Sequence, residues 1–187
     1  MELSHITFGY PGKELFRDFS LTLSPGERVA IMGPSGRGKT TLLRLMAGLE
    51  KPASGRVTGI PREGVSMVFQ EDRLVPGLTV LENLALAAPR ADRSRLLALL
   101  PPLGLRGEEN SLPGSLSGGM ARRVAIARAA ALGSSLVLLD EPFTGLDGSS
   151  REQAAAFLLE RFPHAAMAAV VHHREEAELL QARVLEL

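Results

Sequence analysis

A glycine-rich loop is the first place in this sequence where residue types and spacing could do chemistry. Residues 33–40 read GPSGRGKT and match the pattern G-x-x-x-x-G-K-[ST], between a predicted strand and a predicted helix. Backbone N–H groups of such a loop point inward around phosphate, and the N-terminus of the next helix adds positive potential. We expect Lys39 to reach the terminal phosphates of a nucleotide and the Thr40 hydroxyl to hold Mg²⁺. The residues expected to bind phosphate are Gly33, Pro34, Ser35, Gly36, Arg37, Gly38, Lys39, Thr40 and Thr41.

Two adjacent acids, Asp140 and Glu141, follow the apolar stretch SLVLL at 135–139, which has the composition of a buried strand. Asp140 is the expected partner of the Mg²⁺ ion. Because adjacent strand residues point to opposite sides, Glu141 can have a different task, and we expect it to be the general base. Taken alone, Asp140 and Glu141 also fit a solvated strand end, and the loop at 33–40 also fits a glycine-rich turn without a ligand.

A second candidate anion site lies about 80 residues further along, in the stretch SLSGGMARR at 115–123. A serine hydroxyl and free N–H groups at the start of a helix bind anions, and glycines permit close backbone approach. Arg122 and Arg123 follow on this helix, either as solvated charges or as residues of an interface.

The elements that must position these residues alternate between apolar strands and helices. This alternation predicts an α/β fold with a largely parallel sheet covered by helices on both faces. Residues 73–130 contain no predicted strand, so we expect them to form a helical lobe. Strands are predicted at 19–23, 29–32, 64–70, 135–140, 165–171 and 183–187. Helices are predicted at 40–47, at 79–100 with a break at Pro89, and at 117–131, 148–162 and 174–180.

Composition and charge narrow the function classes. The 187 residues are 45% hydrophobic and 22% charged, which suits one domain with a full core. Lys and Arg number 21 against 21 Asp and Glu, so no direct nucleic-acid partner is expected. The chain has no cysteine for disulfides or thiolate metal sites. We expect no signal peptide and no transmembrane segment, because no apolar run approaches the ~18 residues that a spanning helix needs.

Several motifs, in this order along nearly the whole chain, resemble those of the ATP-binding cassette (ABC) ATPases. They are GPSGRGKT, VFQED, LSGGM, LVLLDEP, TGLD and VVHHREEA. The resemblance implies a P-loop NTPase core of mostly parallel sheet, with a small antiparallel β part at the N-terminus and an inserted short α-helical lobe. It implies one ABC ATPase domain over 1–187, with the α/β core at 1–72 and 131–187 and the helical subdomain at 73–130.

The resemblance also assigns roles to single residues. Tyr10 would stack on adenine, although a half-buried packing role fits it as well. Gln70 would sense the γ-phosphate and Mg²⁺, so the implied metal ligands are Thr40, Gln70 and Asp140. Glu141 and His172 would be catalytic, the first as base and the second holding the attacking water. A shift of one residue in the alignment would exchange His172 and His173.

In the ABC arrangement two domains pair head to tail around ATP and Mg²⁺. Ser117, Gly118 and Gly119 of one chain would then face the γ-phosphate held by the other chain. Asp147 would contribute to nucleotide binding from the loop TGLD at 144–147. The resemblance therefore predicts a dimer that closes on ATP and opens after hydrolysis.

The resemblance is strongest to ATPase subunits of importers of the nitrate, sulfonate and taurine type, through VFQEDRLVPGLTVLENLAL and LSGGM. The function implied is an ATP-hydrolysing motor subunit of a membrane ABC transporter, bound peripherally at the cytoplasmic face of the cell membrane. Its implied partners are a second copy, a transmembrane permease docking near residues 71–84, and a substrate-binding protein. Two alternatives stay open, namely a soluble ABC clamp on nucleic acid or ribosome, and an ATP-gated switch with little turnover.

Overall fold

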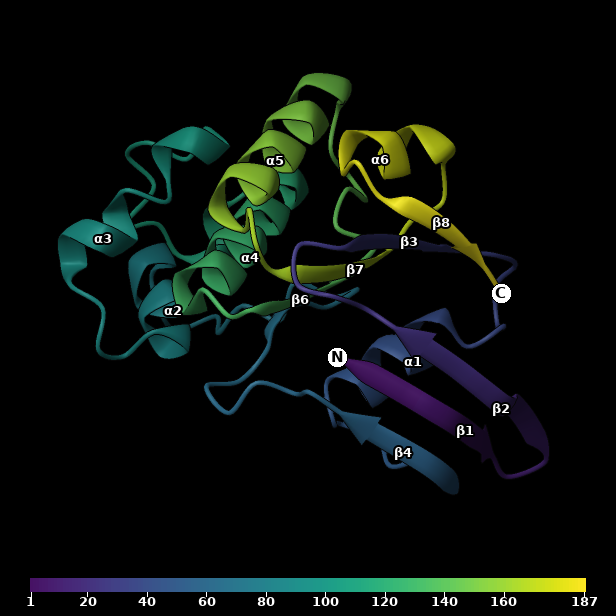
Figure 1. Cartoon of the computed structure of the whole chain (residues 1–187). Helices are drawn as coiled ribbons and strands as arrows, with labels where there is room; N and C mark the ends of the chain where they lie inside the picture. The colour runs from purple at the N-terminus through teal and green to yellow at the C-terminus, as the bar shows by residue number, and fades with distance from the viewer.

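The strands of the protein form two separate sheets, which the computed structural model describes over residues 1–187 (Figure 1). The smaller sheet is antiparallel, with β1 between its two neighbours, and the larger sheet pairs all of its strands in parallel. The smaller sheet has the order β2 (Lys13–Thr22), β1 (Glu2–Tyr10), β4 (Ser54–Thr58). The larger has the order β5 (Ser66–Val68), β6 (Leu136–Asp140), β7 (Ala166–Val170), β3 (Arg28–Met32), β8 (Arg183–Glu186). The parallel α/β fold with an antiparallel N-terminal part, expected from the sequence, is confirmed.

Helices cover both faces of the parallel sheet (Figure 1). Helix α1 (Lys39–Met46) lies between the two sheets, and α4 (Gly118–Leu132) and α5 (Gly148–Arg161) cover the opposite face. Between β5 and β6 the chain forms no strand. The remaining helices are α2 (Val80–Ala87), α3 (Arg93–Leu97) and α6 (Arg174–Leu179), with short 3-10 turns at η1 (Pro101–Leu103) and η2 (Pro113–Ser115). None of these helices combines the length and apolar character needed to cross a bilayer.

Strand β6 shows how the parallel sheet divides the core. Leu136 and Leu138 pack with α1 and the antiparallel sheet, whereas Val137 and Leu139 pack with the helices on the opposite face. All five residues of β6 are buried, which is why its sequence is continuously apolar rather than alternating. The strand is therefore fixed on both faces up to Asp140, its last residue.

Strand β1 was not among the elements predicted residue by residue, and its geometry explains why. Leu3, Ile6 and Phe8 are buried, a spacing that breaks strict alternation. The irregularity lies at His5, whose φ is +51° and where the pairing with β2 shifts register. Strand β4 was also missed, because its residues are nearly all exposed and carry no apolar pattern.

The carboxyl ends of three neighbouring strands carry the residues expected to do chemistry. In the sheet, β6 pairs with β7 and β7 pairs with β3. The loop at 33–38 follows β3, Glu141 follows β6, and His172 lies two residues after β7. Ligands of open parallel sheets bind at this edge, so the fold places these residues at one site.

Candidate functional site

A cavity of about 340 Å³ opens at this edge of the parallel sheet. Its wall combines the hairpin of β1 and β2 with the loop after β3 and with side chains from the ends of β6 and β7. The lining residues are Tyr10, Lys13, Leu15, Ser35, Gly36, Gly38, Lys39, Thr40, Thr41, Gln70, Glu141, Val170 and His172. The walls therefore come from both sheets.

The three glycines of the loop at 33–38 have positive φ values, which residues with a β-carbon rarely adopt. Gly38 has φ of +98° and is the N-cap of α1, with no side chain covering the free N–H groups of the first turn. Lys39 is buried, and its ammonium donates hydrogen bonds to the carbonyls of Gly33 (2.8 Å) and Pro34 (3.1 Å). The side chain of Lys39 is thus folded back over its own loop. Three residues of the loop that were expected to bind phosphate, Gly33, Pro34 and Arg37, do not line the cavity.

Thr40 and Asp140 come together from α1 and β6. The Thr40 hydroxyl donates to Asp140 Oδ1 at 3.2 Å. Asp140 is 2% exposed, and its burial raises the pKa of the carboxyl, while the hydrogen bond from Thr40 acts in the opposite direction. A hydroxyl and one carboxylate are donor types that Mg²⁺ takes from proteins when phosphates and water complete its shell.

Glu141 is the centre of a polar cluster in the cavity. Its Oε1 lies 2.9 Å from His172 Nε2 and accepts a hydrogen bond from Gln70 Nε2 at 3.5 Å. The Thr144 hydroxyl donates to Oε2 at 3.3 Å. A carboxylate held against an imidazole in this way is suited to accept a proton from water. Of the two adjacent histidines, His172 lines the cavity, whereas His173 is the N-cap of α6.

The hairpin of β1 and β2 supplies one expected cavity residue and one that was missed. Tyr10 is 42% exposed at the cavity wall, and its ring meets Phe8 edge-on at 5.3 Å, so the side chain both packs and presents a free face. Lys13 pairs with Tyr10 across the turn and donates from Nζ to the Gly36 carbonyl at 2.9 Å. The turn signal Pro11-Gly12 would have placed Lys13 beside Tyr10.

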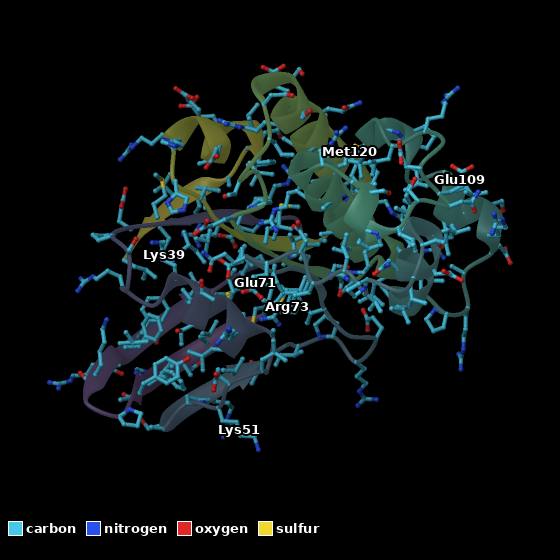
Figure 2. The ribbon with its side chains drawn as sticks, turned by 180° about the vertical axis from the view of Figure 1, so that it is seen from behind. Lys39, Lys51, Glu71, Arg73, Glu109 and Met120 are labelled. Atoms are coloured by element: carbon cyan, nitrogen blue, oxygen red, sulfur yellow. The ribbon has the colours of Figure 1, made fainter.

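The residues at 117–119 do not line this cavity. Ser117 is the N-cap of α4, and its hydroxyl accepts a hydrogen bond from the Met120 N–H at 3.2 Å. Figure 2 shows Met120 well away from Lys39. Asp147, the N-cap of α5, also lies outside the cavity. Hydrogen bonds from the backbone N–H of Ser150 and from the hydroxyls of Ser149 and Ser150 lower the pKa of the Asp147 carboxyl.

The starts of α4 and α5 lie next to each other at Gly119, on one surface of the protein. A β-carbon at Gly119 would lie 3.3 Å from the Gly145 carbonyl, so the start of α4 packs directly against the loop that precedes α5. Ser117, Gly118 and Asp147 are exposed on this side. The chain thus carries one cavity with a phosphate-binding loop and, apart from it, a second exposed cluster of polar groups.

Arg122 is not the solvated charge that one interpretation of the sequence offered, because it is only 3% exposed. Its guanidinium contacts the loop after β5 and the end of β6. Arg123 is also engaged, donating to the Leu103 carbonyl at 2.8 Å. The signal that could have indicated burial is the nearly unbroken apolar run after Arg123, which is typical of a helix covered on several sides.

This fold, with a phosphate-binding loop after β3 and a carboxylate pair after β6, defines a nucleotide-hydrolysing protein of the P-loop class. The family model described as ABC transporter matches residues 16–144. The chain belongs to the ABC transporter family, as the ATP-binding, ATP-hydrolysing subunit expected from its sequence motifs.

Individual proteins and structures agree with this membership. The chain is 44% identical to the aliphatic sulfonates import ATP-binding protein SsuB 1 of Rhodococcus jostii (strain RHA1), over 100% of this chain and 78% of the relative. It is similar to a structure described as the dimeric bacterial ABC transporter cassette MJ0796, with TM-score 0.90, 31% identity, and coverage of 100% and 93%. A second MJ0796 dimer, in a post-hydrolysis state bound to ADP and Pi, gives TM-score 0.85 and 29% identity, with the same coverage.

Proposed function

We propose that this chain is the ATPase motor subunit of an importer of the aliphatic sulfonate type, working as a head-to-tail dimer. The observation that carries the proposal is the separation of Ser117–Gly119 from the cavity that contains Lys39. Two unlike half-sites on one chain can be completed only by a second copy. Support for the transported class comes from the relative named as an aliphatic sulfonates import protein.

ATP occupies the 340 Å³ cavity in this proposal. The phosphates lie on the loop at 33–38 and the free N–H groups of α1, and Lys39 swings from the loop carbonyls to the phosphate oxygens. The face of Tyr10 stacks on adenine. Thr40 and Asp140, with Gln70, are the residues that would hold Mg²⁺, which neutralises phosphate charge when bound.

Glu141 accepts the proton of the water that attacks the γ-phosphate. His172, 2.9 Å from the Glu141 carboxylate, holds that carboxylate and the water in line. Gln70 contacts the same carboxylate from the loop after β5, so that loop is within reach of both the base and the γ-phosphate. The chemistry therefore depends on three side chains brought together from three strand ends.

The second copy supplies Ser117, Gly118, Gly119 and Asp147 to the γ-phosphate. The Gly118 and Gly119 N–H groups lie in the first turn of α4, where a partner's anion is favoured. Loss of the γ-phosphate on hydrolysis removes the group that joins the two halves, and the dimer opens. We propose the division into a core at 1–72 and 131–187 and a helical subdomain at 73–130, because Lys39 and Glu141 belong to the core and Ser117–Gly119 to the helical subdomain.

A permease segment docks in a second, mainly apolar cavity of about 460 Å³. Its wall includes Leu49, Ile60, Phe69, Arg73, Arg128 and Leu132. This cavity borders the loop after β5, and Figure 2 shows Glu71 and Arg73 between the strand-rich and helical parts. Docking there would place the chain at the cytoplasmic face of the membrane, with a substrate-binding protein on the other side.

Complementation between two inactive variants tests the dimer. Lys39→Ala removes the phosphate-binding lysine, and Ser117→Arg blocks the exposed cluster with a long side chain. Each homodimer then has no intact site, whereas a mixed dimer has one. We expect each variant alone to be inactive, and an equimolar mixture to regain up to about a quarter of the wild-type sites by random pairing.

Trapping the dimer gives a second measurement of the same proposal. Glu141→Gln removes the base but leaves the cavity polar, so we expect this variant to bind ATP and to form stable dimers in size-exclusion chromatography. A mixture of Lys39→Ala and Ser117→Arg that stays inactive, together with a monomeric Glu141→Gln in saturating ATP, would contradict the head-to-tail site.

A further inference from the structure

We infer that Arg122 is a positioning residue that ties the Gln70 loop to the hydrolytic base Glu141. The side chain starts on α4, five residues after Ser117, and its guanidinium lies between two segments that carry catalytic groups. One buried cation thereby joins the start of α4, the loop after β5 and the end of β6. This role rests on the proposed function, because it assumes that Glu141 is the base.

One side of the guanidinium holds the Gln70 loop. Arg122 Nη1 donates to the carbonyls of Phe69 (2.7 Å) and Gln70 (3.3 Å) and to Asp72 Oδ1 (2.9 Å). Asp72 is the only carboxylate within ion-pair distance of Arg122. With the ion pair and two backbone carbonyls engaged, the loop cannot shift without moving the arginine.

The other side of the guanidinium holds the backbone of the two acids. Arg122 Nη2 donates to the carbonyls of Asp140 (2.8 Å) and Glu141. Glu141 has φ of +52°, a left-handed conformation that is costly for a residue other than glycine and persists only where its surroundings impose it. The backbone contacts at this residue are the hydrogen bond from Arg122, the one from the Glu141 N–H to the Val170 carbonyl at 3.1 Å, and the one from the Thr144 N–H to the Glu141 carbonyl at 3.2 Å.

Arg128 provides a matched comparison on the same helix. It donates to the carbonyls of Arg73 (2.6 Å) and Asp72 (2.7 Å), so it also anchors the loop after β5. It makes no hydrogen bond to Asp140 or Glu141. Arg128 therefore anchors the loop alone, and of the two arginines only Arg122 also contacts the backbone of Glu141.

The connection has a direct consequence for the reaction. When nucleotide or a permease segment moves the Gln70 loop, Arg122 carries the displacement to the Glu141 backbone and so to its carboxylate. Displacements of about 1 Å at a reacting group are enough to change a rate by ~100-fold. Turnover should therefore depend on Arg122, whereas ATP binding at the loop of 33–41 should not.

The experiment compares Arg122→Met with Arg128→Met in the full chain. Both variants lose a guanidinium and keep a stem of similar length. We expect Arg122→Met to lower kcat by about 10- to 100-fold with the Kd for a fluorescent ATP analogue unchanged. Arg128→Met should lower kcat less than Arg122→Met does, because it leaves the hydrogen bonds from Arg122 to the Asp140 and Glu141 carbonyls in place. Arg122→Lys keeps the positive charge opposite Asp72 but cannot donate hydrogen bonds to both segments at once. Its kcat should therefore lie between those of Arg122→Met and wild type.

The outcomes separate this role from the dimer itself. Wild-type kcat in a folded Arg122→Met or Arg122→Lys variant would overturn the inference, as would failure of both to fold, which would make the residue purely structural. Equal losses of kcat in Arg122→Met and Arg128→Met would also overturn it. In a Glu141→Gln background, Arg122→Met should still form ATP-dependent dimers. Absence of dimers in Glu141→Gln alone would instead count against the proposed function.

Discussion

At the scale of single residues, the site depends on which of two adjacent histidines faces the base. His172 Nε2 lies 2.9 Å from Glu141 Oε1, whereas His173 begins α6. Glu176 supports the turn between them by accepting hydrogen bonds from the backbone N–H groups of both histidines, at 3.0 and 3.3 Å. This turn, together with the end of β7, directs the first histidine into the cavity.

Alanine at each histidine in turn provides a direct comparison. We expect His172→Ala to lower kcat by about tenfold or more with unchanged ATP affinity, because the base loses its partner. His173→Ala should leave kcat unchanged and lower the melting temperature slightly through the start of α6. Steady-state ATPase assays and thermal melts measure both quantities. A loss of turnover confined to His173→Ala would mean that the roles are exchanged.

The buried carboxyl of Asp140 gives the stability a defined pH dependence. Its pKa is raised mainly by burial, so the folded protein keeps this proton to higher pH than the unfolded chain does. Ionisation above that pKa therefore costs stability, and Asp140→Asn removes the cost. We expect the nucleotide-free variant to melt above wild type at pH 8, and the difference to shrink as the pH falls toward about 4.

Asp147 serves as the control with the opposite sign. Hydrogen bonds from Ser150 and Ser149 lower its pKa, so its charge stabilises the folded state at neutral pH. Asp147→Asn should melt below wild type at pH 8, and this difference should also shrink as the pH falls. A difference between Asp140→Asn and wild type that is the same at every pH would contradict the assignment to Asp140.

The sequence predicted part of this site at residue level, and physical reasons limit the rest. The loop at 33–40 and the acids at 140 and 141 are local motifs, so their spacing was sufficient. Arg122 was ambiguous because its five partner residues, from Phe69 to Glu141, lie 18 to 53 positions away in the sequence. A residue whose role depends on long-range backbone carbonyls leaves no local pattern.

At the scale of elements, two helix N-caps of similar chemistry have different expected roles. Thr79 caps α2 in a reciprocal arrangement, accepting from the Glu82 N–H at 3.3 Å while its own N–H donates to Glu82 Oε2 at 2.8 Å. Ser117 caps α4 without such a partner. The Thr79 cap forms a complete capping box, whereas the Ser117 cap leaves the start of α4 exposed.

Replacing each cap by alanine should separate stability from turnover. We expect Thr79→Ala and Ser117→Ala each to lower the free energy of unfolding by about 1 kcal/mol. Only Ser117→Ala should also lower ATP turnover, because its hydroxyl would face the partner's γ-phosphate. Urea unfolding and ATPase assays on the same preparations provide the two measurements. Equal effects on turnover would show that Ser117 acts as a cap and nothing more.

The predicted strands of the parallel sheet were correct, and the clearest of them, β6 and β7, are buried along their whole length and therefore continuously apolar. The antiparallel sheet was harder to predict from the sequence, because the irregularity at His5 interrupts the alternation of buried residues in β1. Asp18 on β2 has a similar φ of +53°. Those two side chains contact each other at 2.6 Å on the surface. Only the pairing of the two strands reveals that contact.

At the scale of the whole molecule, the two hydrophobic cores meet across the parallel sheet. One core contains 17 buried residues and lies between the sheets around α1, and the other contains 31 and lies under α2, α4 and α5. The proposed nucleotide site is at the edge of the first core, and the exposed cluster at Ser117 is over the second. Closure of a dimer would therefore form contacts with the parts of each chain that surround both hydrophobic cores.

The composite wall of the cavity has a consequence for how the protein would respond to its own substrate. Tyr10 and Lys13 belong to the antiparallel sheet, whereas Lys39, Glu141 and His172 are carried by the parallel sheet and α1. A bound nucleotide would span that seam, with its base on one layer and its phosphates on the other. Each catalytic cycle would then form and break contacts between the nucleotide and the hairpin of β1 and β2, so that bound ATP would transiently stabilise the packing of the two sheets.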